Sequence, residues 1–568
     1  MESVQHYIKE GILYEPVIPN INQWPIAQLF TRKEQFLGEV IEDSMDRLRN
    51  YAEQVGQSVP DVIERTMFLE NIRMKEDPWK VDPKDEMRFW SQIKKELVLN
   101  EQVEQDRGSF DARTQRMLRD ITARYGEEIL SPFKPGSYHF AKRFLPFFFS
   151  TILNASAGKT FKSLIKHSVQ LQERVHMLGH IKEIRNLATK GTVILVPTHF
   201  SNVDSILIGW GLHAIGLPAF IYGAGLNLFN NKVLAYFMGR LGAYKLDRRK
   251  RNPIYRSTLD AYSTIAIQEG VHSLFFPGGT RSRSGQIEKN LKLGLLGTAM
   301  EAQRRNFLTK PRGVSEKIFV VPMVMSYHFV LEAKSLIRQH LKRTGQEQYY
   351  VLDSESNSYT KLLSFIWSFF RSSSDIILSF GQPMDLFGNF VDEHGISHDS
   401  HGREIDIKSY FKSGGAISRD PQRDQEYTRM LGEKIVDRYH IENHVFSSHV
   451  VAFVAFEMLQ KKYNHLDLYG LLRLNEDDRI INRAEFTEVC DRIIGRIRYL
   501  ADRRKVHLAT HMINDTASII DHGIKNIGIY HEKKSLKYLN ETTLITENMN
   551  LLYYYHNRLE GYGLKLYI

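Results

Sequence analysis

His199 and Asp204 bring an imidazole and a carboxylate close together in the sequence VILVPTHFSNVDSILIG. Residues 193–196 before them are aliphatic and mostly β-branched, which predicts a buried strand. Ser201 or Asn202 is a suitable N-cap for a helix that carries Asp204. We therefore expect His199 to lie between the end of a strand and the start of a helix.

The position of His199 outside the helix decides whether the two side chains can meet. Two positions five apart on a continuous helix point about 140° away from each other, whereas a non-helical His199 can fold back onto Asp204. A carboxylate placed there fixes the tautomer of the imidazole and stabilises the imidazolium that forms when the other ring nitrogen takes a proton from a hydroxyl. The pair therefore indicates a general base for a hydroxyl.

The spacing alone is weak evidence, because the chain has 22 His and the same His-x4-Asp pattern occurs at His394/Asp399 and His401/Asp406. Those two pairs lie in VDEHGISHDSHGREID, where no strand precedes them. The context favours His199 as the catalytic histidine, and the alternative is a hydrogen-bonded structural histidine.

A second segment with chemical potential is HSLFFPGGTRSRSGQIEKNLKLGLLG, which predicts a strand, a glycine-rich turn and a helix bearing Lys292. Backbone amides at Gly278 and Gly279 can approach an anion closely, while Arg281, Arg283 and Lys292 can hold phosphate oxygens. The segment indicates a phosphate cradle, and the alternative is a solvated basic turn.

GAYKLDRRKRNPIY adds Arg248 and Arg249 after another short strand. Both residues would bring positive charge to the same edge of the sheet, and we favour Arg248 as a phosphate ligand. A basic surface run is the alternative.

The composition describes an ordinary folded protein with a basic balance. Lysine and arginine number 76 against 66 acidic residues, a formal net charge of +10, and the calculated pI is about 9.2. This balance suits an anionic partner: a phosphorylated substrate, a lipid surface or nucleic acid. The one cysteine, Cys490, excludes an internal disulfide and a zinc site of paired cysteines, and we expect it to be a packed side chain.

The sequence predicts no membrane-spanning helix, because no run of 18 or more apolar residues occurs, and MESVQHYIKEG has no signal-peptide character. The segment KRFLPFFFSTILNASAGKTFKSLIKH, residues 142–167, mixes aromatic and cationic side chains. It predicts either peripheral contact with a membrane surface or a helix packed on the core.

The order of patterns predicts a helical N-terminal region (1–135), an α/β domain (136–420) and a helical C-terminal domain (421–568). Six apolar runs alternate with helical patterns between about 180 and 385, which indicates an α/β fold, a mixed sheet flanked by helices. Residues 388–420 are polar and predict a loop. A metal site at His394, His398 and His401 is a weak alternative, since no ordered element is expected to fix them.

Two nucleotide-binding patterns are incomplete. AGKT at 157–160 resembles the end of a Walker loop, but the leading glycine is replaced by Leu153 and no strand precedes it. Gly209, Gly211 and Ala214 mimic a dinucleotide fingerprint but fall inside the helix expected after His199. Neither pattern predicts a nucleotide site.

Taken together, these segments resemble the glycerolipid acyltransferases, the family of glycerol-3-phosphate and lysophosphatidic acid acyltransferases with a His-x4-Asp block. GAYKLDRR resembles the second block of the family, with Arg248 at the substrate arginine, and FPGGTRSRSG resembles the third, FPEGTRSRSG. Lys292 and Gly294 match residues that follow it. VVPMVMSY, with Pro322, and SFGQP match later blocks, and the helical segment HVFSSHVVAFVAF is more loosely similar to the tail of the long glycerol-3-phosphate enzymes.

The resemblance implies transfer of a fatty acyl group from acyl-CoA or acyl carrier protein to glycerol 3-phosphate, with His199 as the base and Asp204 as its partner. Backbone amides at Gly278 and Gly279 are candidate stabilisers of the oxyanion. It further implies no metal or other cofactor, no nucleic-acid partner and a peripheral place on the cytoplasmic side of an anionic membrane.

The sequence departs from the family at Gly278, where the third block has a glutamate implicated in acceptor binding, so the acceptor is in doubt. A lysophosphatidate (1-acylglycerol-3-phosphate) acyltransferase is one alternative. A non-catalytic lipid-binding or membrane-binding protein that retains the fold is another.

Overall fold

The computed structural model describes residues 14–101, 107–138, 175–226, 229, 232–309, 316–345, 375–529 and 531–568. At its centre lies a seven-stranded sheet in the order β1-β7-β6-β2-β5-β3-β4. The strands are β1 (Val175–Gly179), β2 (Thr192–Pro197), β3 (Ile221–Gly225), β4 (Ala243–Leu246), β5 (Ser273–Leu274), β6 (Ile318–Tyr327) and β7 (Ile376–Phe380). The β6–β7 pair is antiparallel and the other pairs are parallel. The predicted mixed sheet is confirmed, although β1 was not among the predicted runs.

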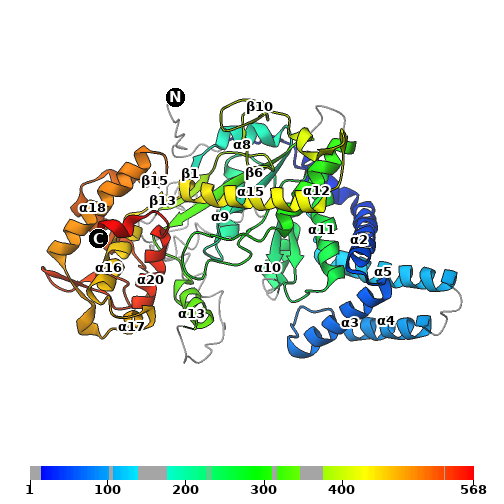
Figure 1. The fold of residues 1–568 in the computed structure, drawn as a ribbon, viewed down its shortest axis with the longest axis horizontal. Helices are drawn as coiled ribbons and strands as arrows, with labels where there is room; N and C mark the ends of the chain where they lie inside the picture. The colour runs from blue at the N-terminus through cyan, green and yellow to red at the C-terminus, as the bar shows by residue number, and fades with distance from the viewer. Residues whose placement is uncertain are drawn as a thin grey trace, which may run out of the picture.

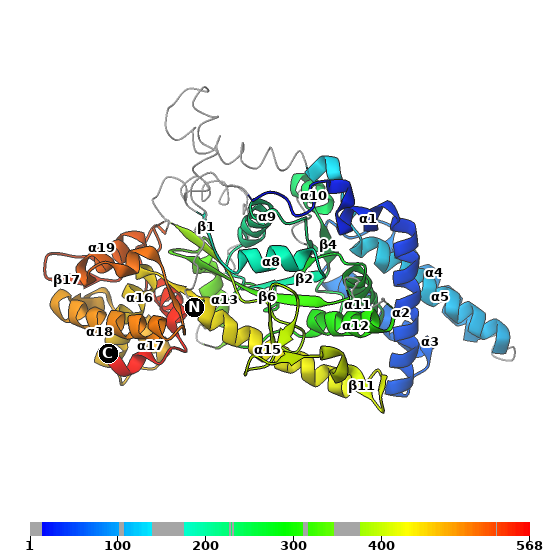
Figure 2. The same cartoon turned by 90° about the horizontal axis from the view of Figure 1, so that it is seen from above.

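Helices cover both faces of this sheet (Figure 2). α8 (Ile181–Ala188) and α9 (Asp204–Ala214) lie on one face, and α11 (Pro253–Gln268), α12 (Gly294–Thr309) and α15 (Pro421–Glu442) lie on the other. In β2, Val193 and Leu195 join the apolar cluster under α8 and α9, whereas Ile194 and Val196 join the one under α12 and α15. Because both faces are buried, the strand is a continuous apolar run rather than an alternating one.

The N-terminal region is helical, as predicted, and packs beside α11 (Figure 1). Its helices are α1 (Pro25–Thr31), α2 (Lys33–Val55), α3 (Val59–Glu76), α4 (Glu86–Glu101) and α5 (Arg107–Ile129). Arg73 lies at its centre, buried among three carboxylates. One of these, Glu70, accepts the side-chain amide of Asn252 at 2.7 Å, which joins the region to the start of α11.

The C-terminal region is built around the buried helix α16 (Ser447–Lys462). The helices α17 (Leu468–Leu472), α18 (Arg483–Asp502), α19 (Thr516–Asn526) and α20 (Met549–His556) belong to the same region, as do the short strands β13 (His444–Val445), β14 (Ile480–Asn482), β15 (His507–Leu508), β16 (Lys537–Tyr538) and β17 (Thr543–Ile545). α15, which follows the predicted boundary near residue 420, packs against α12 and β6 of the central sheet. The boundaries themselves stay predictions.

Residues 388–420 form short hairpins, which corrects the predicted loop. β8 (Phe390–Val391), β9 (Ser397–His398) and β10 (Glu404–Ile405) form one antiparallel sheet, and β11 (Lys412–Ser413) pairs with β12 (Ala416–Ile417). Asp392 and Asp399 each accept two backbone N–H groups from the turn that follows them. Short polar side chains thus satisfy these turns locally, a kind of order that an apolar pattern does not reveal.

The aromatic and basic segment 142–167 and the AGKT tetrapeptide within it lie outside the described residues. None of the helices in the described ranges combines the length and apolar content needed to cross a bilayer.

Candidate active site

His199 lies two residues after the end of β2 and five before Asp204, the first residue of α9. His199 Nδ1 and Asp204 Oδ2 are 2.8 Å apart, so the predicted contact is present. Because an ionised carboxylate only accepts, Nδ1 carries the proton and Nε2 keeps its lone pair. Among the described residues, Nε2 has no hydrogen-bond partner, so it is the basic atom of the site.

Asp204 is held by more than the imidazole. Its carboxylate is fully buried and accepts the backbone N–H groups of Phe200 at 2.7 Å and Ser201 at 2.9 Å, and Tyr327 donates its hydroxyl to the other oxygen. Four donors keep this buried charge solvated by protein groups. The aspartate cannot turn away from His199 without breaking them.

The predicted N-cap is wrong. The N-cap residue of α9 is Val203, whose side chain makes no capping hydrogen bond. Ser201 instead donates its hydroxyl to Glu332 Oε2 at 2.8 Å, and Asn202 N donates to Glu332 Oε1 at 3.0 Å. The helix start is therefore satisfied by one carboxylate distant in sequence, Glu332, and by Asp204 itself, which a local capping rule does not anticipate.

The arginine-bearing turn is attached directly to the histidine. The backbone N–H of Ser282 donates to the carbonyl of His199 at 2.7 Å, and the imidazole stacks on Phe276 with ring centroids 4.0 Å apart. These contacts bring together two motifs that lie about 80 residues apart in the sequence. The parallel arrangement of β2 and β5 explains why they meet, since the carboxyl ends of the two strands share one edge of the sheet.

Three of the predicted phosphate ligands lie near one another. Desolvation by neighbouring protein groups lowers the pKa of Arg248 even though this residue is exposed at the surface, and the positive charge of Arg281 lowers the pKa further. The pKa of Arg283 is lowered by burial and by the charges of three other arginines, Arg281 and Arg248 among them. Arginines that repel one another favour an anion between them. Arg281 also lies 3.4 Å from Glu332, the acid that holds the start of α9.

Arg249 does not belong to this group. It forms ion pairs with Asp247 at 2.7 Å and Asp82 at 2.5 Å, and its guanidinium stacks over Trp79. Its role is to join the end of β4 to the N-terminal helices. Arg248 is the more exposed of the two and, among the described residues, has no carboxylate partner. Its role as a phosphate ligand stays a prediction.

Lys292 lies in the loop before α12, which corrects the predicted helix. α12 begins at Gly294, and Lys292 N donates to the carbonyl of Pro277 at 2.7 Å. The lysine side chain runs across Gly279, where a Cβ atom would lie 2.6 Å from Lys292 Cδ. Gly279 also has φ +75°, so its glycine is required both by the backbone and by this close approach.

The oxyanion role predicted for Gly279 finds no support in this geometry. Its amide donates to the carbonyl of Phe276 at 2.9 Å and is therefore occupied within the turn. A free amide aimed at a developing oxyanion would be needed for that role.

Sequence reasoning missed several residues that hold the site. Glu332 and Tyr327 belong to or follow β6, and Arg558 comes from the end of the C-terminal region. Arg558 is buried, donates to the carbonyl of Met325 at 2.7 Å and lies over the ring of Phe200 at 4.2 Å. Of these residues, only Tyr327 could have been found from the sequence, since it is the last residue of the VVPMVMSY block.

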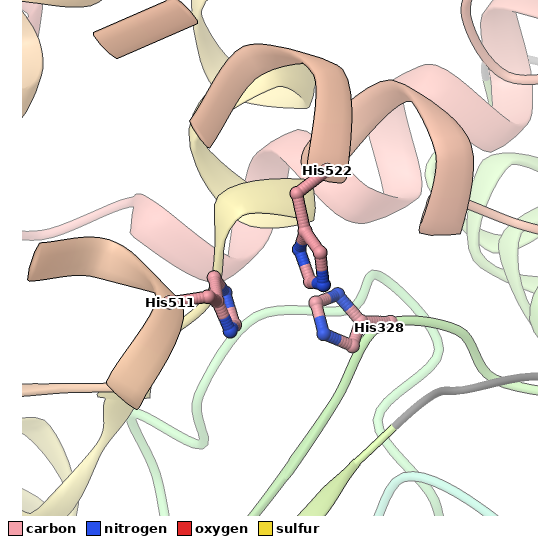
Figure 3. Close-up of side chains that lie close together, drawn as sticks. All are labelled: His328, His511 and His522. Carbon is pink, nitrogen blue, oxygen red and sulfur yellow. The ribbon is translucent and has the colours of Figure 1, made fainter. Parts of the chain in front are cut away.

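The histidines of the weak metal alternative are not arranged as a metal site. His394, His398 and His401 do not converge: His398 Nε2 lies 3.1 Å from Asp392 Oδ2, and the backbone of the other two satisfies neighbouring turns. The described residues contain a closer cluster of His328, His511 and His522, whose ring nitrogens lie within 4.8 Å of one another (Figure 3).

This second cluster caps the start of α16. His511 Nε2 accepts the N–H of Ser447 at 3.0 Å, His522 Nδ1 lies 2.8 Å from Ser447 Oγ, and His328 Nδ1 lies 3.0 Å from Ser448 Oγ. Because Nε2 of His511 is an acceptor, its proton is on Nδ1 and the ring offers no lone pair to a metal. Burial also lowers the pKa of all three, that of His511 to about 4.

Comparison with known proteins agrees with this geometry. The family model described as Acyltransferase matches residues 179–326, from the end of β1 to β6. The glycerol-3-phosphate acyltransferase of Pseudomonas fluorescens (strain Pf0-1) is 26% identical over 473 residues, which are 82% of this chain and 46% of the relative. The enzyme of the same name from Pseudomonas savastanoi pv. phaseolicola is 26% identical over 454 residues, 78% of this chain and 45% of the relative.

The chain thus spans about half the length of the curated relatives it matches. Among solved structures, the 1-acyl-sn-glycerophosphate (LPA) acyltransferase of Thermotoga maritima is similar over 53% of this chain and 92% of its own, with 14% identity and a TM-score of 0.21.

The mixed sheet, the histidine–aspartate pair at its edge and the family match define an α/β protein with an acyltransferase domain. More particularly, the Acyltransferase model matches residues 179–326, and the chain is similar, at 26% identity, to proteins named glycerol-3-phosphate acyltransferase.

Proposed function

We propose that this protein transfers a fatty acyl group from acyl-CoA or acyl carrier protein to a hydroxyl of glycerol 3-phosphate in phospholipid biosynthesis. The observation that carries the proposal is the bond from Ser282 N to the carbonyl of His199, which ties a general base to a turn bearing arginines. A base beside a phosphate site suits a phosphorylated alcohol as the acceptor.

In the proposed reaction, His199 Nε2 removes the proton of the acceptor hydroxyl as its oxygen attacks the thioester carbonyl. The C–S bond of the tetrahedral intermediate then breaks, and the thiolate takes the proton from the imidazolium. Asp204 stabilises the imidazolium through the 2.8 Å contact to Nδ1. A thioester is already an activated acyl donor, so we propose no metal or redox cofactor and no acyl-enzyme.

The acceptor phosphate is assigned to Arg248, Arg281, Arg283 and Lys292. Arg281 is the central residue of this set, because its charge lowers the pKa of both Arg248 and Arg283. A phosphate dianion would relieve this repulsion and gain charge-assisted hydrogen bonds. We also propose peripheral contact with an anionic membrane on its cytoplasmic side, supported by the net charge of +10.

The names of the relatives and the long flanking regions favour glycerol 3-phosphate as the acceptor, while GAYKLDRRKRN favours the monoacyl compound. A direct test measures release of CoA from palmitoyl-CoA with each acceptor in turn. We expect the higher kcat/KM with glycerol 3-phosphate. A higher kcat/KM with lysophosphatidate would select the second activity. If no CoA is released with either acceptor, and no acyl group is transferred from acyl carrier protein, a non-catalytic lipid-binding protein would be favoured.

A further inference from the structure

Gly278 is not required by the backbone, unlike its neighbour Gly279. Its φ lies outside the left-handed region, so any residue could adopt its conformation. A Cβ atom at position 278, however, would lie 2.9 Å from Cγ and 3.1 Å from Oε1 of Glu288. The side chain of Glu288 therefore occupies the space that a side chain at position 278 would need.

The carboxyl group of Glu288 lies against the backbone of His199. Its Oε1 accepts the backbone N–H of His199 at 3.1 Å, and its Oε2 is buried with no hydrogen-bond partner among the described residues. A buried acid with an unsatisfied oxygen is costly and needs an explanation in function or stability.

The surroundings of Glu288 come from three other elements. Its pKa is raised to about 7, mainly by burial and to a smaller extent by the negative charge of Asp204 in α9, while the His199 N–H and the positive charge of Arg558 limit the rise. The charge of Glu288 also contributes to raising the pKa of Tyr439 in α15, whose hydroxyl donates to the carbonyl of Val196 at 2.9 Å. Glu288 thus lies between the catalytic pair and a buried arginine of the C-terminal region.

We propose that Glu288 is a positioning residue for the catalytic histidine. Its carboxylate occupies the space beside Gly278, which has no side chain of its own, and accepts the backbone N–H of His199. By accepting the His199 N–H, Glu288 sets the backbone from which the imidazole reaches the acceptor hydroxyl. The backbone N–H of Ser282 holds the carbonyl of His199, so both backbone polar groups of His199 are anchored by residues 282–288. The inference rests on the proposed function of His199.

The first test moves the carboxylate between the two positions. Glu288→Ala should lower kcat about 10-fold or more, because a small displacement of the base is costly, while the acceptor KM changes less than about twofold. Adding Gly278→Glu to this variant should restore kcat at least about threefold, since the new side chain can enter the vacated space. Gly278→Glu alone should be strongly impaired, because the space is filled.

The control for this series is Asn290→Ala, an exposed residue of the same loop, which should keep wild-type kcat. Thermal unfolding checks that each variant is folded. A Glu288→Ala protein with wild-type kcat, or a double variant without recovery, would overturn the proposal.

The second test needs no enzymatic activity. Carbethoxylation of His199 by diethyl pyrocarbonate, followed by peptide mass spectrometry at one pH, reports how firmly the imidazole is held in the whole protein. Glu288→Ala removes the acceptor of the His199 N–H, so the rate of carbethoxylation of His199 should rise at least about twofold, while Asn290→Ala should keep the wild-type rate. An unchanged rate in Glu288→Ala would contradict the inference. If the wild type transfers no acyl group, the proposed function fails, whereas this rate still tests Glu288.

Discussion

The same His-x4-Asp spacing leads to different structures in two regions of this protein. At the end of β2, His199 and Asp204 form a contact of 2.8 Å, and the aspartate is fully buried. In the hairpin segment 388–420, the spacing occurs twice, but the aspartates serve the backbone. Asp399 accepts the N–H groups of His401 and Arg403, and Asp406 accepts that of Lys408 at the start of a 3-10 helix.

The difference shows that the same residue spacing brings the histidine and the aspartate into contact only where a strand and a helix meet. A buried strand end places His199 outside the helix, the first turn of α9 presents Asp204, and Tyr327 from β6 holds the second oxygen of the carboxylate. In the hairpin segment, the strands before His394 and His401 are only two residues long and partly buried. Among the described residues, no donor from another element contacts the carboxylate of Asp406. Each of the following experiments changes matched residues in the two regions.

The largest expected effect is that of His199→Ala, which removes the proposed base. Turnover should fall at least about 100-fold with the protein still folded, because general-base catalysis is lost. His394→Ala and His401→Ala are the matched variants and should keep wild-type turnover. Steady-state release of CoA measures all three, and near-normal turnover by His199→Ala would end the assignment.

Asp204→Asn should have the second-largest effect on kcat. An amide can present N–H to His199 Nδ1 and so favour the wrong tautomer, and kcat should fall by about 100-fold. Asp399→Asn changes the same atom in the hairpin segment and should leave kcat unchanged. Equal activity in the two variants would mean that the carboxylate of Asp204 does not orient the base.

Arg281→Ala should act mainly on binding. Loss of a charge-assisted hydrogen bond should raise the KM for the phosphorylated acceptor about 10-fold, with a smaller change in kcat. The matched variant is Arg403→Ala, which loses only a surface pair with Asp399. An unchanged KM in Arg281→Ala would remove this residue from the phosphate site.

The smallest effect concerns pH and stability. Burial lowers the pKa of His272 to about 4, and its Nδ1 accepts the N–H of Val193 in β2. Between that value and the unfolded pKa near 6.5, the unfolded chain binds more protons than the native one, so stability falls as the pH falls through this window. His272 should account for about 1 kcal/mol of the loss between pH 7 and 5.5.

Urea denaturation at both pH values measures this contribution, which should disappear in His272→Gln. In the exposed hairpin, the hydrogen bond to Asp392 raises the pKa of His398 instead, so His398→Gln should not reduce the loss. A His272→Gln protein with the wild-type pH dependence would contradict the prediction.

Local patterns were sufficient for the central elements. The aliphatic runs predicted six of the seven strands, and β1, VHMLG, was missed because its histidine and short length weaken the pattern. The contact between His199 and Asp204 also followed from local reasoning, since both residues lie within one strand-to-helix turn. The hairpins of 388–420 were missed because aspartate side chains, rather than apolar periodicity, order them.

From residue order alone came the α/β architecture, the basic character of the protein and the histidine, aspartate and arginines proposed for the reaction, because periodicity and residue chemistry are local properties. Folding added Glu332, Tyr327, Glu288 and Arg558 around the His199 turn, separated Arg248 from Arg249, and placed Lys292 over Gly279. These contacts join positions from residue 82 to residue 558, and only the packing of the sheet against its helices and the C-terminal region brings them within hydrogen-bond distance.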